Sequence, residues 1–479
     1  MNQGQRADLV HARLPEWVHA RGEAIAIRNG MRLLTFAQLH EAVTRRSNEL
    51  QQSHAPAILL VNDALSLTDR LVDFLGIISS GRCAAVGDPE WPTSVRKTVS
   101  ATLSKQATEP PAPLSNSLFY VGYTSGSTGV PKGYTRHHQS WTSSFRACLE
   151  EFGPHASSCI LAPGGDSHSL FLFGMMLGLW SGAGVVVQER FSAAGVLDTL
   201  RRGLTPCLVA VPSQLMMMIE VAKHRGCAAI EEVRLILISG SRWNRARTAE
   251  LRALFPCARI IEFYGASETS FIAWMDTDET TPAQVVGRPF KSVDVQIRDI
   301  HEGEQAGLIY VRSPMVFTDY VGGVADDTAA IRDGDWLCVR DLGYFDEQGR
   351  LCLAGRQNRM LVTQGKNLFP EELESVLATY PGIVSASVHG VDDPLRGLQV
   401  VAILQLKQNP ADAPPRPLQL SNWCRQSLEA YKAPRRYFVC NDWRLTSSGK
   451  TDHRALAQSL RQHLDGSASA DFPCLTPLH

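Results

Sequence analysis

The stretch YTSGSTGVPKG, Tyr123–Gly133, is the most informative part of this 479-residue sequence. It begins at the end of the apolar run Leu118–Tyr123, which predicts a buried strand, and it places glycines and small hydroxyl residues ahead of Lys132. Glycines let a backbone approach anionic oxygens without a Cβ in the way, hydroxyls can donate to phosphate, and the lysine adds positive charge. The pattern differs from a P-loop, because Lys132 follows proline and no Ser or Thr comes directly after it. We interpret it as a phosphate-binding loop rather than a flexible surface loop.

Strands and helices alternate on both sides of this loop. Further strands are predicted at Glu23–Arg28, Arg32–Thr35, Ala57–Val61, Cys83–Val86, Gly184–Val187, Cys207–Val211, Leu235–Ile238 and Ile260–Phe263. Helices are predicted at Phe36–Leu50, at Leu71–Ser79, in the apolar segment before Gly184 and from Pro212 onward, and Ala101–Ser115 is predicted to be a loop. This alternation predicts an α/β fold with mostly parallel sheets joined by crossover helices.

The character of the sequence changes after Val285. Short strands with close turns predict a small antiparallel sheet or barrel there; they lie at Val293–Arg298, Gly307–Arg312, Trp336–Val339 and Leu351–Leu353. From Glu371 a helix–strand–strand–helix–strand pattern predicts a small α+β domain. We therefore expect a large N-terminal domain over residues 1–357, a small mobile C-terminal domain over residues 358–462, and a loose tail over residues 463–479.

The composition excludes several classes of protein. Lys and Arg total 47 against 48 Asp and Glu, and the net charge of -1 gives no bulk attraction to nucleic acid or an anionic membrane surface. The 11 cysteines form no CxxC pair, which favours free thiols in a cytoplasmic protein over a metal site. The N-terminus has no apolar secretory segment, and glycines interrupt the longest apolar run, Leu170–Val187, so no membrane span is expected.

Tyr123–Gly133 resembles the phosphate-loop signature of the acyl-adenylate-forming superfamily, which includes acyl-CoA synthetases, the adenylation domains of peptide synthetases, and luciferases. Further segments occur in the family's order over essentially the whole chain: SGSRW at Ser239–Trp243, YGASE at Tyr264–Glu268, DLGYFDEQGRLCLAGRQNR from Asp341, and TSSGKTDHRAL at Thr446–Leu456. The resemblance implies an enzyme that binds ATP and Mg²⁺. The residues that it assigns to ATP or AMP are Thr124, Ser125, Gly126, Ser127, Thr128, Gly129, Lys132, Gly240, Ser241, Tyr264, Gly265, Ala266, Ser267, Asp341, Arg356 and Lys450.

The same resemblance implies roles for individual nucleotide-binding residues. Tyr264 is expected to stack on adenine, and Glu268 is expected to hold Mg²⁺ together with Thr124, because Mg²⁺ prefers oxygen ligands. Asp341 is expected to accept hydrogen bonds from the ribose hydroxyls, and Arg356 to reach the ribose or the phosphate. The family has Thr-Gly before this aspartate, where the present sequence has Val339-Arg340.

Two positions concern the small domain. Asn358 falls on the hinge between the domains, where Asn tolerates unusual backbone angles. Lys450 matches the catalytic lysine of the family, which would bridge the substrate carboxylate and the α-phosphate as negative charge gathers there. The expected catalytic set is Lys450, Glu268, Thr124 and Lys132.

His168, within GGDSHSLFLFG, lies where the family has a gate beside the acyl pocket. Amino-acid-activating relatives have an aspartate at this point, so His168 favours a carboxylic acid without an α-amino group, although Asp166 is close by in sequence. The expected acyl pocket consists of His168, Phe171, Ser213, Ser239 and Phe263. The alternatives are a core histidine and an apolar stripe that belongs to the core.

The expected activity is ATP-dependent activation of a small-molecule carboxylic acid to an acyl-AMP, with release of pyrophosphate, followed by transfer to coenzyme A. The segments GKNLFPEELE and YKAPRRYF look like those of free-standing acyl-CoA ligases, and Lys432, Arg435 and Arg436 are candidates for contacts with the phosphates of coenzyme A. Two alternatives stay open: transfer to an acyl-carrier-protein thiol or an amine, and a nucleotide-binding relative without catalysis.

Overall fold

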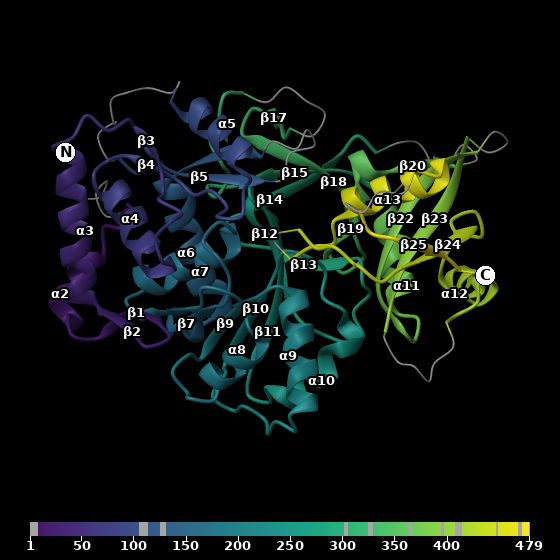
Figure 1. The fold of residues 1–479 in the computed structure, drawn as a ribbon, viewed down its shortest axis with the longest axis horizontal. Coiled ribbons are helices and arrows are strands. Elements are labelled where there is room, and N and C mark those ends of the chain that lie inside the picture. Colours follow the sequence, from purple (N-terminus) through teal and green to yellow (C-terminus); the bar gives the residue numbers. More distant parts are fainter. Residues whose placement is uncertain are drawn as a thin grey trace.

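The computed structural model describes residues 8–104, 114–124, 131–300, 305–323, 329–363, 366–393, 397–407, 414–446, 449–467 and 472–478. Two large sheets and their helices form the N-terminal part, and a smaller α+β part follows, drawn in light green and yellow on the right of Figure 1. The predicted α/β class, with a small α+β C-terminal unit, is confirmed.

The largest sheet combines a parallel half and an antiparallel half. Its strands are, in spatial order, β14 (Asp294–Arg298), β15 (Gly307–Arg312), β18 (Trp336–Phe345), β19 (Leu351–Arg356), β13 (Val285–Pro289), β12 (Ser270–Asp276), β11 (Arg259–Ala266), β10 (Leu235–Ile238), β9 (Cys207–Ala210), β7 (Ile160–Ala162), β8 (Val185–Val187), β1 (Ile25–Asn29) and β2 (Arg32–Thr35), with β17 (Ile331–Asp333) beside β18. The strands from β1 to β11 pair in parallel, whereas those from β11 to β14 are antiparallel. The predicted antiparallel region therefore continues the parallel sheet.

A second sheet carries the predicted phosphate loop. Its order is β16 (Asp319–Tyr320), β6 (Lys132–His137), β5 (Leu118–Thr124), β4 (Cys83–Ala85) and β3 (Ile58–Leu60). The helices of the N-terminal part are α2 (Leu14–Arg21), α3 (Phe36–Gln51), α4 (Leu67–Ser79), α5 (Thr93–Leu103), α6 (His138–Phe152), α7 (Ser169–Trp180), α8 (Ala193–Leu200), α9 (Pro212–His224) and α10 (Thr248–Leu254), with short 3₁₀ turns η1 (Pro154–Ser157) and η2 (Arg245–Arg247).

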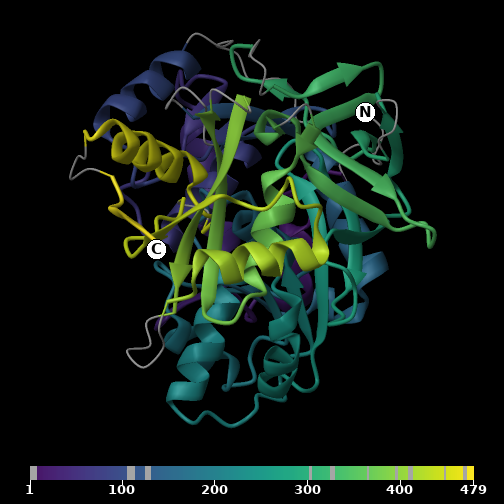
Figure 2. The ribbon, with the colours of Figure 1, turned by 90° about the vertical axis from the view of Figure 1, so that its right-hand side faces the viewer.

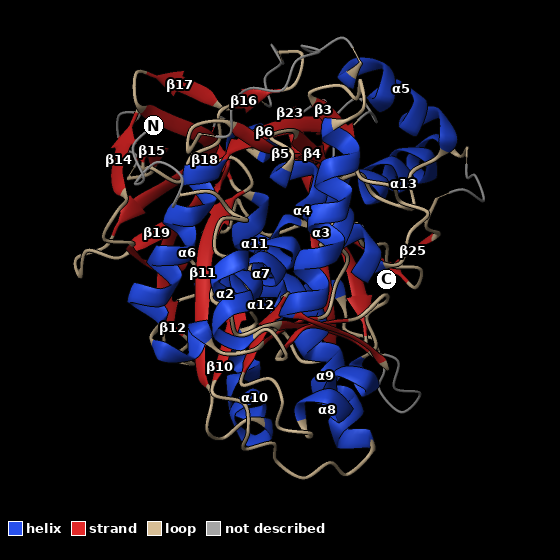
Figure 3. Ribbon diagram, turned by 90° about the vertical axis from the view of Figure 1, so that its left-hand side faces the viewer, coloured by secondary structure: helices blue, strands red, loops and turns tan. Residues whose placement is uncertain are grey.

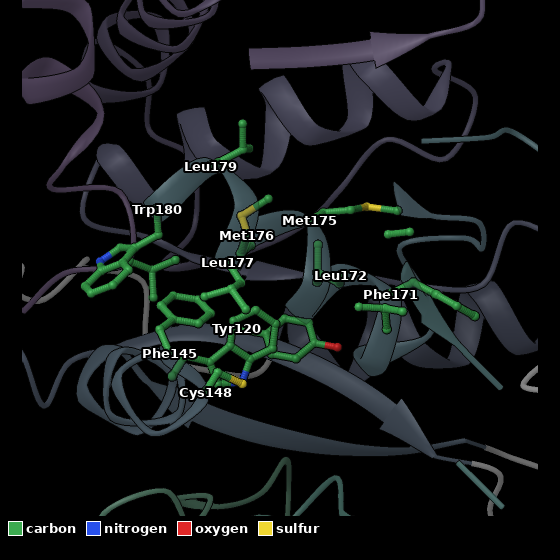
Figure 4. Packing of buried hydrophobic residues seen from close by; sticks show 14 of the residues in the cluster. Tyr120, Phe145, Cys148, Phe171, Leu172, Met175, Met176, Leu177, Leu179 and Trp180 are labelled. Carbon is green, nitrogen blue, oxygen red and sulfur yellow. The ribbon is translucent and has the colours of Figure 1, made fainter. Parts of the chain in front are cut away.

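The helices and sheets form layers, with helices in blue and strands in red in Figure 3. One apolar cluster joins α6 and α7 to both sheets, and a second joins the opposite face of the large sheet to α8, α9 and α10. Alternate residues of β7 divide between these clusters: Ile160 and Ala162 lie in the first and Leu161 in the second, as the period of a strand requires. Figure 4 shows Tyr120, Phe145 and Cys148 packed against the apolar side chains of α7. A helix that is apolar all round is stable only in such a buried layer.

The C-terminal part is built on a four-stranded sheet, and its light green and yellow elements face the viewer in Figure 2. Its strands are β22 (Ile383–Asp393), β23 (Gly397–Leu406), β24 (Arg436–Cys440) and β25 (Leu475–Pro477), and its helices are α11 (Pro370–Ala378), α12 (Pro417–Ser427) and α13 (His453–Asp465). The 3₁₀ turn η3 (Gln357–Arg359) and a hairpin of β20 (Leu361–Thr363) and β21 (Lys366–Leu368) precede them.

Two predictions of irregular structure are wrong in part. The expected tail over residues 463–479 contains the end of α13 and strand β25, because Leu475 is buried against Phe438 and Leu460 and extends the small sheet. The expected loop Ala101–Ser115 begins within α5, because Val99 and Leu103 pack on the second sheet. Both segments are polar in sequence and gain their structure from a few apolar contacts. No helix among the described residues is long and apolar enough to cross a membrane.

Candidate active site

The predicted phosphate loop connects two paired strands. Thr124 is the last residue of β5, Lys132 is the first of β6, and the two residues are register partners at the end of the antiparallel ladder. The chain therefore leaves the sheet and returns to it at adjacent positions. The loop residues themselves, Ser125, Gly126, Ser127, Thr128 and Gly129, lie outside the described residues.

Tyr264, Asp341 and Arg356 form a hydrogen-bonded group at the end of β11. The Tyr264 hydroxyl donates to Asp341 Oδ2 over 2.6 Å, and Arg356 Nε donates to Asp341 Oδ1 over 3.0 Å. Asp341 is only 4% exposed, and burial together with its charge raises the pKa of Tyr264. The same carboxylate raises the pKa of Arg356. A carboxylate has about four acceptor positions, so Asp341 can accept further donors such as ribose hydroxyls.

The unusual Val339-Arg340 pair precedes this aspartate. Arg340 has a φ of +64°, a left-handed conformation that glycine adopts far more readily. Its side chain is anchored, because Arg340 Nε donates to the carbonyl of Ala329 over 2.9 Å and Nη1 donates to Gln357 Oε1 over 3.1 Å. The two hydrogen bonds hold a strained residue in place beside Asp341 and connect it to the 3₁₀ turn η3.

Glu268 lies in the turn between β11 and β12. The Phe317 backbone N–H donates to the Glu268 carbonyl over 2.6 Å, and the Tyr320 hydroxyl donates to Glu268 Oε1 over 3.0 Å. Tyr320 belongs to β16, which pairs with β6, so this carboxylate lies on the side of the phosphate-loop hairpin. Gly265 is required here, since a Cβ at this position would stand 1.8 Å from the Ser270 carbonyl oxygen.

These residues fit Mg²⁺ that arrives with a nucleotide. No cluster of three or more His, Cys, Asp or Glu side chains suited to a metal ion occurs within the described part of the chain. Mg²⁺ usually binds through one or two carboxylates together with substrate phosphates, and not in a cage of protein ligands. The single half-buried carboxylate of Glu268, which accepts from the Tyr320 hydroxyl, matches that donor set. Thr124, the other expected ligand, is the last residue of β5.

Lys450 comes from the C-terminal part and reaches the large sheet. Its Nζ is close enough to Arg356, Asp341 and Glu268 to interact with their charges. Burial and the positive charge of Arg356 lower the pKa of Lys450 to about 8, against the opposing effect of the two carboxylates. Gly240 lies next to the Lys450 side chain: a Cβ added at Gly240 would stand 4.0 Å from Lys450 Cε.

The loop that carries Lys450 is fixed to both parts of the chain. Ser213 Oγ at the start of α9 donates to the Gly449 carbonyl over 3.3 Å, and Lys450 N donates to Thr446 Oγ1 over 3.2 Å. Lys450 and Arg356 stay open to solvent although protein atoms surround them closely enough to shift both pKa values.

The expected acyl-pocket residues fall into two groups. His168 and Phe171 lie at the start of α7, with ring centroids 5.0 Å apart, and His168 Nδ1 accepts from the Leu170 backbone N–H as the helix cap. Phe171 is buried, and its ring covers Gly164, where a Cβ would be only 2.1 Å away.

Ser239 and Phe263 come directly after Ile238 and Glu262, which are register partners in the parallel strands β10 and β11. Ser239 Oγ donates to the Phe263 carbonyl over 3.0 Å. Ser213 and Ser239 are thus half-buried near Lys450 and Gly240, whereas Ser241 is exposed.

Asp166 is unavailable to a substrate ammonium. It is 1% exposed and forms an ion pair with Arg70, whose Nη2 lies 2.6 Å from Asp166 Oδ1. Burial raises the pKa of Asp166 to about 6, and Arg70 opposes that shift. The ion pair with Arg70 therefore gives Asp166 a structural role.

Polar contacts surround the expected hinge. Asn358 is exposed in the middle of η3, between Arg356, which binds Asp341, and Arg359, which binds Glu371 and Glu374 on α11. Arg242, within SGSRW, donates to Ser375 of α11. Asn358 thus lies between a side chain bonded to the large sheet and one bonded to the small domain.

Sequence patterns did not single out four polar side chains at this site: Arg70, Arg136, Arg242 and Tyr320. Two are buried arginines, and a charged residue inside a buried strand or helix, such as Arg136 within KGYTRH, was the available signal. Each of the four has a partner far away in sequence, and spacing alone does not reveal these long-range contacts.

Comparisons with known proteins agree with this arrangement. The family model described as AMP-binding enzyme matches residues 54–321, and that described as AMP-binding enzyme C-terminal domain matches residues 372–450. An uncharacterized acyl–CoA ligase of Bacillus subtilis, YhfT, is 34% identical over 434 residues, covering 89% of this chain and 78% of the relative.

Two solved structures share the fold. O-succinylbenzoate coenzyme A synthetase (MenE) of Bacillus subtilis, bound to its acyl-adenylate, superposes with a TM-score of 0.76 at 23% identity, covering 92% of this chain and 97% of that one. The amide bond synthetase McbA of Marinactinospora thermotolerans gives a TM-score of 0.77 at 22% identity, covering 94% and 100%. The match to both domain models and the similarity to YhfT over most of both chains place this protein in the family of AMP-binding enzymes.

Proposed function

We propose that the protein activates a carboxylic acid with ATP and transfers the acyl group to coenzyme A. The observation that carries the proposal is the convergence at Lys450. This ammonium from the C-terminal part lies close enough to Glu268, Asp341 and Arg356 for their charges to shift its pKa. A cation that lies near the Asp341 carboxylate and near the half-buried serines beside Gly240 is suited to hold two anionic substrates together.

In the first step a carboxylate oxygen of the acid attacks the α-phosphorus of ATP, the bond to the β-phosphate oxygen breaks, and pyrophosphate leaves. Lys450 stabilises the charge that develops on the α-phosphoryl oxygens, and Lys132 with its loop steadies the leaving pyrophosphate. Asp341, already oriented by Tyr264 and Arg356, accepts from the ribose. Mg²⁺, when bound at Glu268, neutralises phosphate charge.

In the second step a thiolate attacks the acyl carbonyl, and AMP leaves as the carbon–oxygen bond breaks. The name of the relative YhfT, an acyl–CoA ligase, supports coenzyme A as the acceptor. Lys432 is already held by Glu372 and Glu429, each at 2.8 Å, so we assign phosphate contacts to the exposed Arg435 and Arg436 instead. Residues 358–465 with β25 act as the domain that turns at Asn358 between the steps, and the contacts of Arg242 and Arg359 hold the first arrangement.

The second candidate is transfer to an amine, favoured by the likeness to the amide bond synthetase McbA, and a carrier-protein thiol is the related variant. The acceptor is decided by the product formed from one acyl-AMP pool. Coenzyme A, a set of amines and a phosphopantetheinylated carrier protein should be offered separately after adenylation, with AMP release and the acyl product measured by mass spectrometry.

The first test is ATP–pyrophosphate exchange with short, medium, long and aromatic acids. We expect exchange with at least one acid that lacks an α-amino group, lost in Lys450→Ala and kept in Arg425→Ala, a change on the exposed surface of α12. Wild-type activity in Lys450→Ala, or no exchange with any acid despite ATP binding, would contradict the proposal.

A further inference from the structure

Arg136 is a buried cation that the proposed chemistry does not use. It lies on β6, four residues after Lys132, and is 1% exposed. Alternate residues of a strand share one face, so Lys132, Tyr134 and Arg136 point to the same side of β6. Burial lowers the pKa of Arg136 to about 10, while the charges of Tyr134, Tyr120 and Glu268 oppose that shift. A guanidinium in such a place is costly unless its hydrogen-bonding capacity is used.

The guanidinium is bonded to the turn that carries Glu268. Arg136 Nη1 donates to the Ser267 carbonyl over 2.8 Å, and Nη2 donates to Ser270 Oγ over 2.5 Å. These two acceptors flank Glu268 on either side. Nη2 also donates to the Met315 carbonyl over 2.6 Å, and Nε donates to Ser140 Oγ over 3.2 Å. One side chain thus joins β6, the start of α6, the β11–β12 turn and the segment before β16.

The turn needs such support. Ser270 has a φ of +56°, an unfavourable conformation for a residue with a Cβ, and its hydroxyl is one of the acceptors of Arg136. Within the turn, the backbone N–H of Ala266 donates to Thr269 Oγ1 over 3.0 Å. Phe317 and Tyr320 bond to Glu268 from the other side, and they belong to the segment that Arg136 reaches through Met315.

We infer that Arg136 is a positioning residue that fixes the Glu268 carboxylate relative to the phosphate-loop hairpin for Mg²⁺·ATP binding. The inference rests on the proposed role of Glu268. It assigns to Arg136 no contact with substrate: the residue acts by holding the Ser267–Ser270 turn against the strand that begins at Lys132. Loss of the guanidinium lets the turn move, so binding that depends on the metal weakens more than binding of the nucleotide alone.

The test compares ATP affinity with Mg²⁺ and with EDTA, by calorimetry on the full chain without acid or coenzyme A. In Arg136→Met we expect the ratio of the two affinities to fall at least about tenfold, the size of a lost charged hydrogen bond, with little change in EDTA. Arg136→Lys keeps a buried cation, and Ser270→Ala keeps Arg136 itself. For both variants we expect a smaller reduction of the Mg²⁺/EDTA affinity ratio than for Arg136→Met. These milder variants supply the measurement if Arg136→Met does not fold.

Arg245 offers a matched control. It is 7% exposed and donates to Glu262 in the middle of β11 and to the carbonyls of Thr281, Pro282 and Val285 around the start of β13, and none of these acceptors belongs to the turn that carries Glu268. Arg245→Lys should lower the melting temperature but leave the Mg²⁺/EDTA affinity ratio at the wild-type value. Hydrogen exchange of the peptide spanning Ser267–Ser270 should increase in Arg136→Lys and not in Arg245→Lys.

The outcomes separate the two proposals. If folded Arg136 variants bind ATP with the wild-type ratio, or if Arg245→Lys lowers that ratio equally, the positioning role is wrong and the proposed function stands. If the wild-type protein binds no ATP under either condition, the proposed function fails and the inference fails with it.

Discussion

The pH dependence of adenylation should report the charge of Lys450. The proposed mechanism needs the ammonium, and the structure lowers the pKa of Lys450 from the ordinary lysine value to about 8. The cation is therefore present below pH 8 and is lost as the pH rises through that value. The parameter kcat/KM reflects the free enzyme, so for ATP it should fall about tenfold per pH unit above pH 8.

The size of the decline follows from the contribution of one preorganised charge-stabilising donor. Such a donor contributes about 10²–10³ in kcat, or about 3–4 kcal/mol. The decline should therefore level off at the activity of Lys450→Ala, which should itself be independent of pH in this range. Lys450→Arg keeps a cation at every accessible pH, so its profile should stay flat above pH 8 whatever its absolute rate.

Neighbouring charges provide a second control on the same assay, which is initial-rate pyrophosphate release from pH 6.5 to 10. Arg356 lowers the pKa of Lys450, and Glu268 raises it. Removing the arginine charge in Arg356→Gln should move the alkaline limb to higher pH, and Glu268→Gln should move it to lower pH, although both variants are slower. A wild-type profile that is flat to pH 10, or an alkaline limb that persists in Lys450→Arg, would refute the assignment.

Three further changes test other parts of the structure. Asp166→Asn removes the charged partner of the buried Arg70 and should lower the free energy of unfolding, measured by urea titration, by about 3–5 kcal/mol. An unchanged free energy of unfolding would show that Arg70 has another partner for its charge. Leu475→Ala should destabilise the small domain by about 2–3 kcal/mol, because it removes a buried side chain of β25. Leu418→Ala, at a leucine that is 68% exposed, should have no effect on stability. Equal effects of the two changes would mean that β25 does not pack as described. Gly265→Ala places a Cβ against the Ser270 carbonyl oxygen, so it should weaken Mg²⁺·ATP binding, measured by calorimetry. The nearby change Ala266→Gly should weaken that binding less. The reverse order of the two effects would contradict the described turn.

The sequence anticipated those parts of the fold that depend on neighbours along the chain. Strand β2 lies at the predicted Arg32–Thr35, α3 begins at the predicted Phe36, and α9 begins at the predicted Pro212. Strand β5 was predicted from the apolar run before the glycine-rich loop, whereas its antiparallel partner β6 was not predicted. Strand β25 and the end of α5 were missed, since each depends on one or two apolar side chains that fit a distant surface.

The candidate site divides in the same way. The types and order of its residues, from the phosphate loop to Lys450, are properties of the sequence, because the chemistry of phosphate, metal and carboxylate binding restricts which side chains can serve. Only the tertiary structure decided that Tyr264 and Arg356 both donate to Asp341. It also decided that Asp166 forms an ion pair with Arg70 and that Arg136 donates to the turn that carries Glu268. These contacts join segments far apart in the chain. Their formation depends on which apolar faces pack together, and that is a property of the whole core rather than of any local pattern.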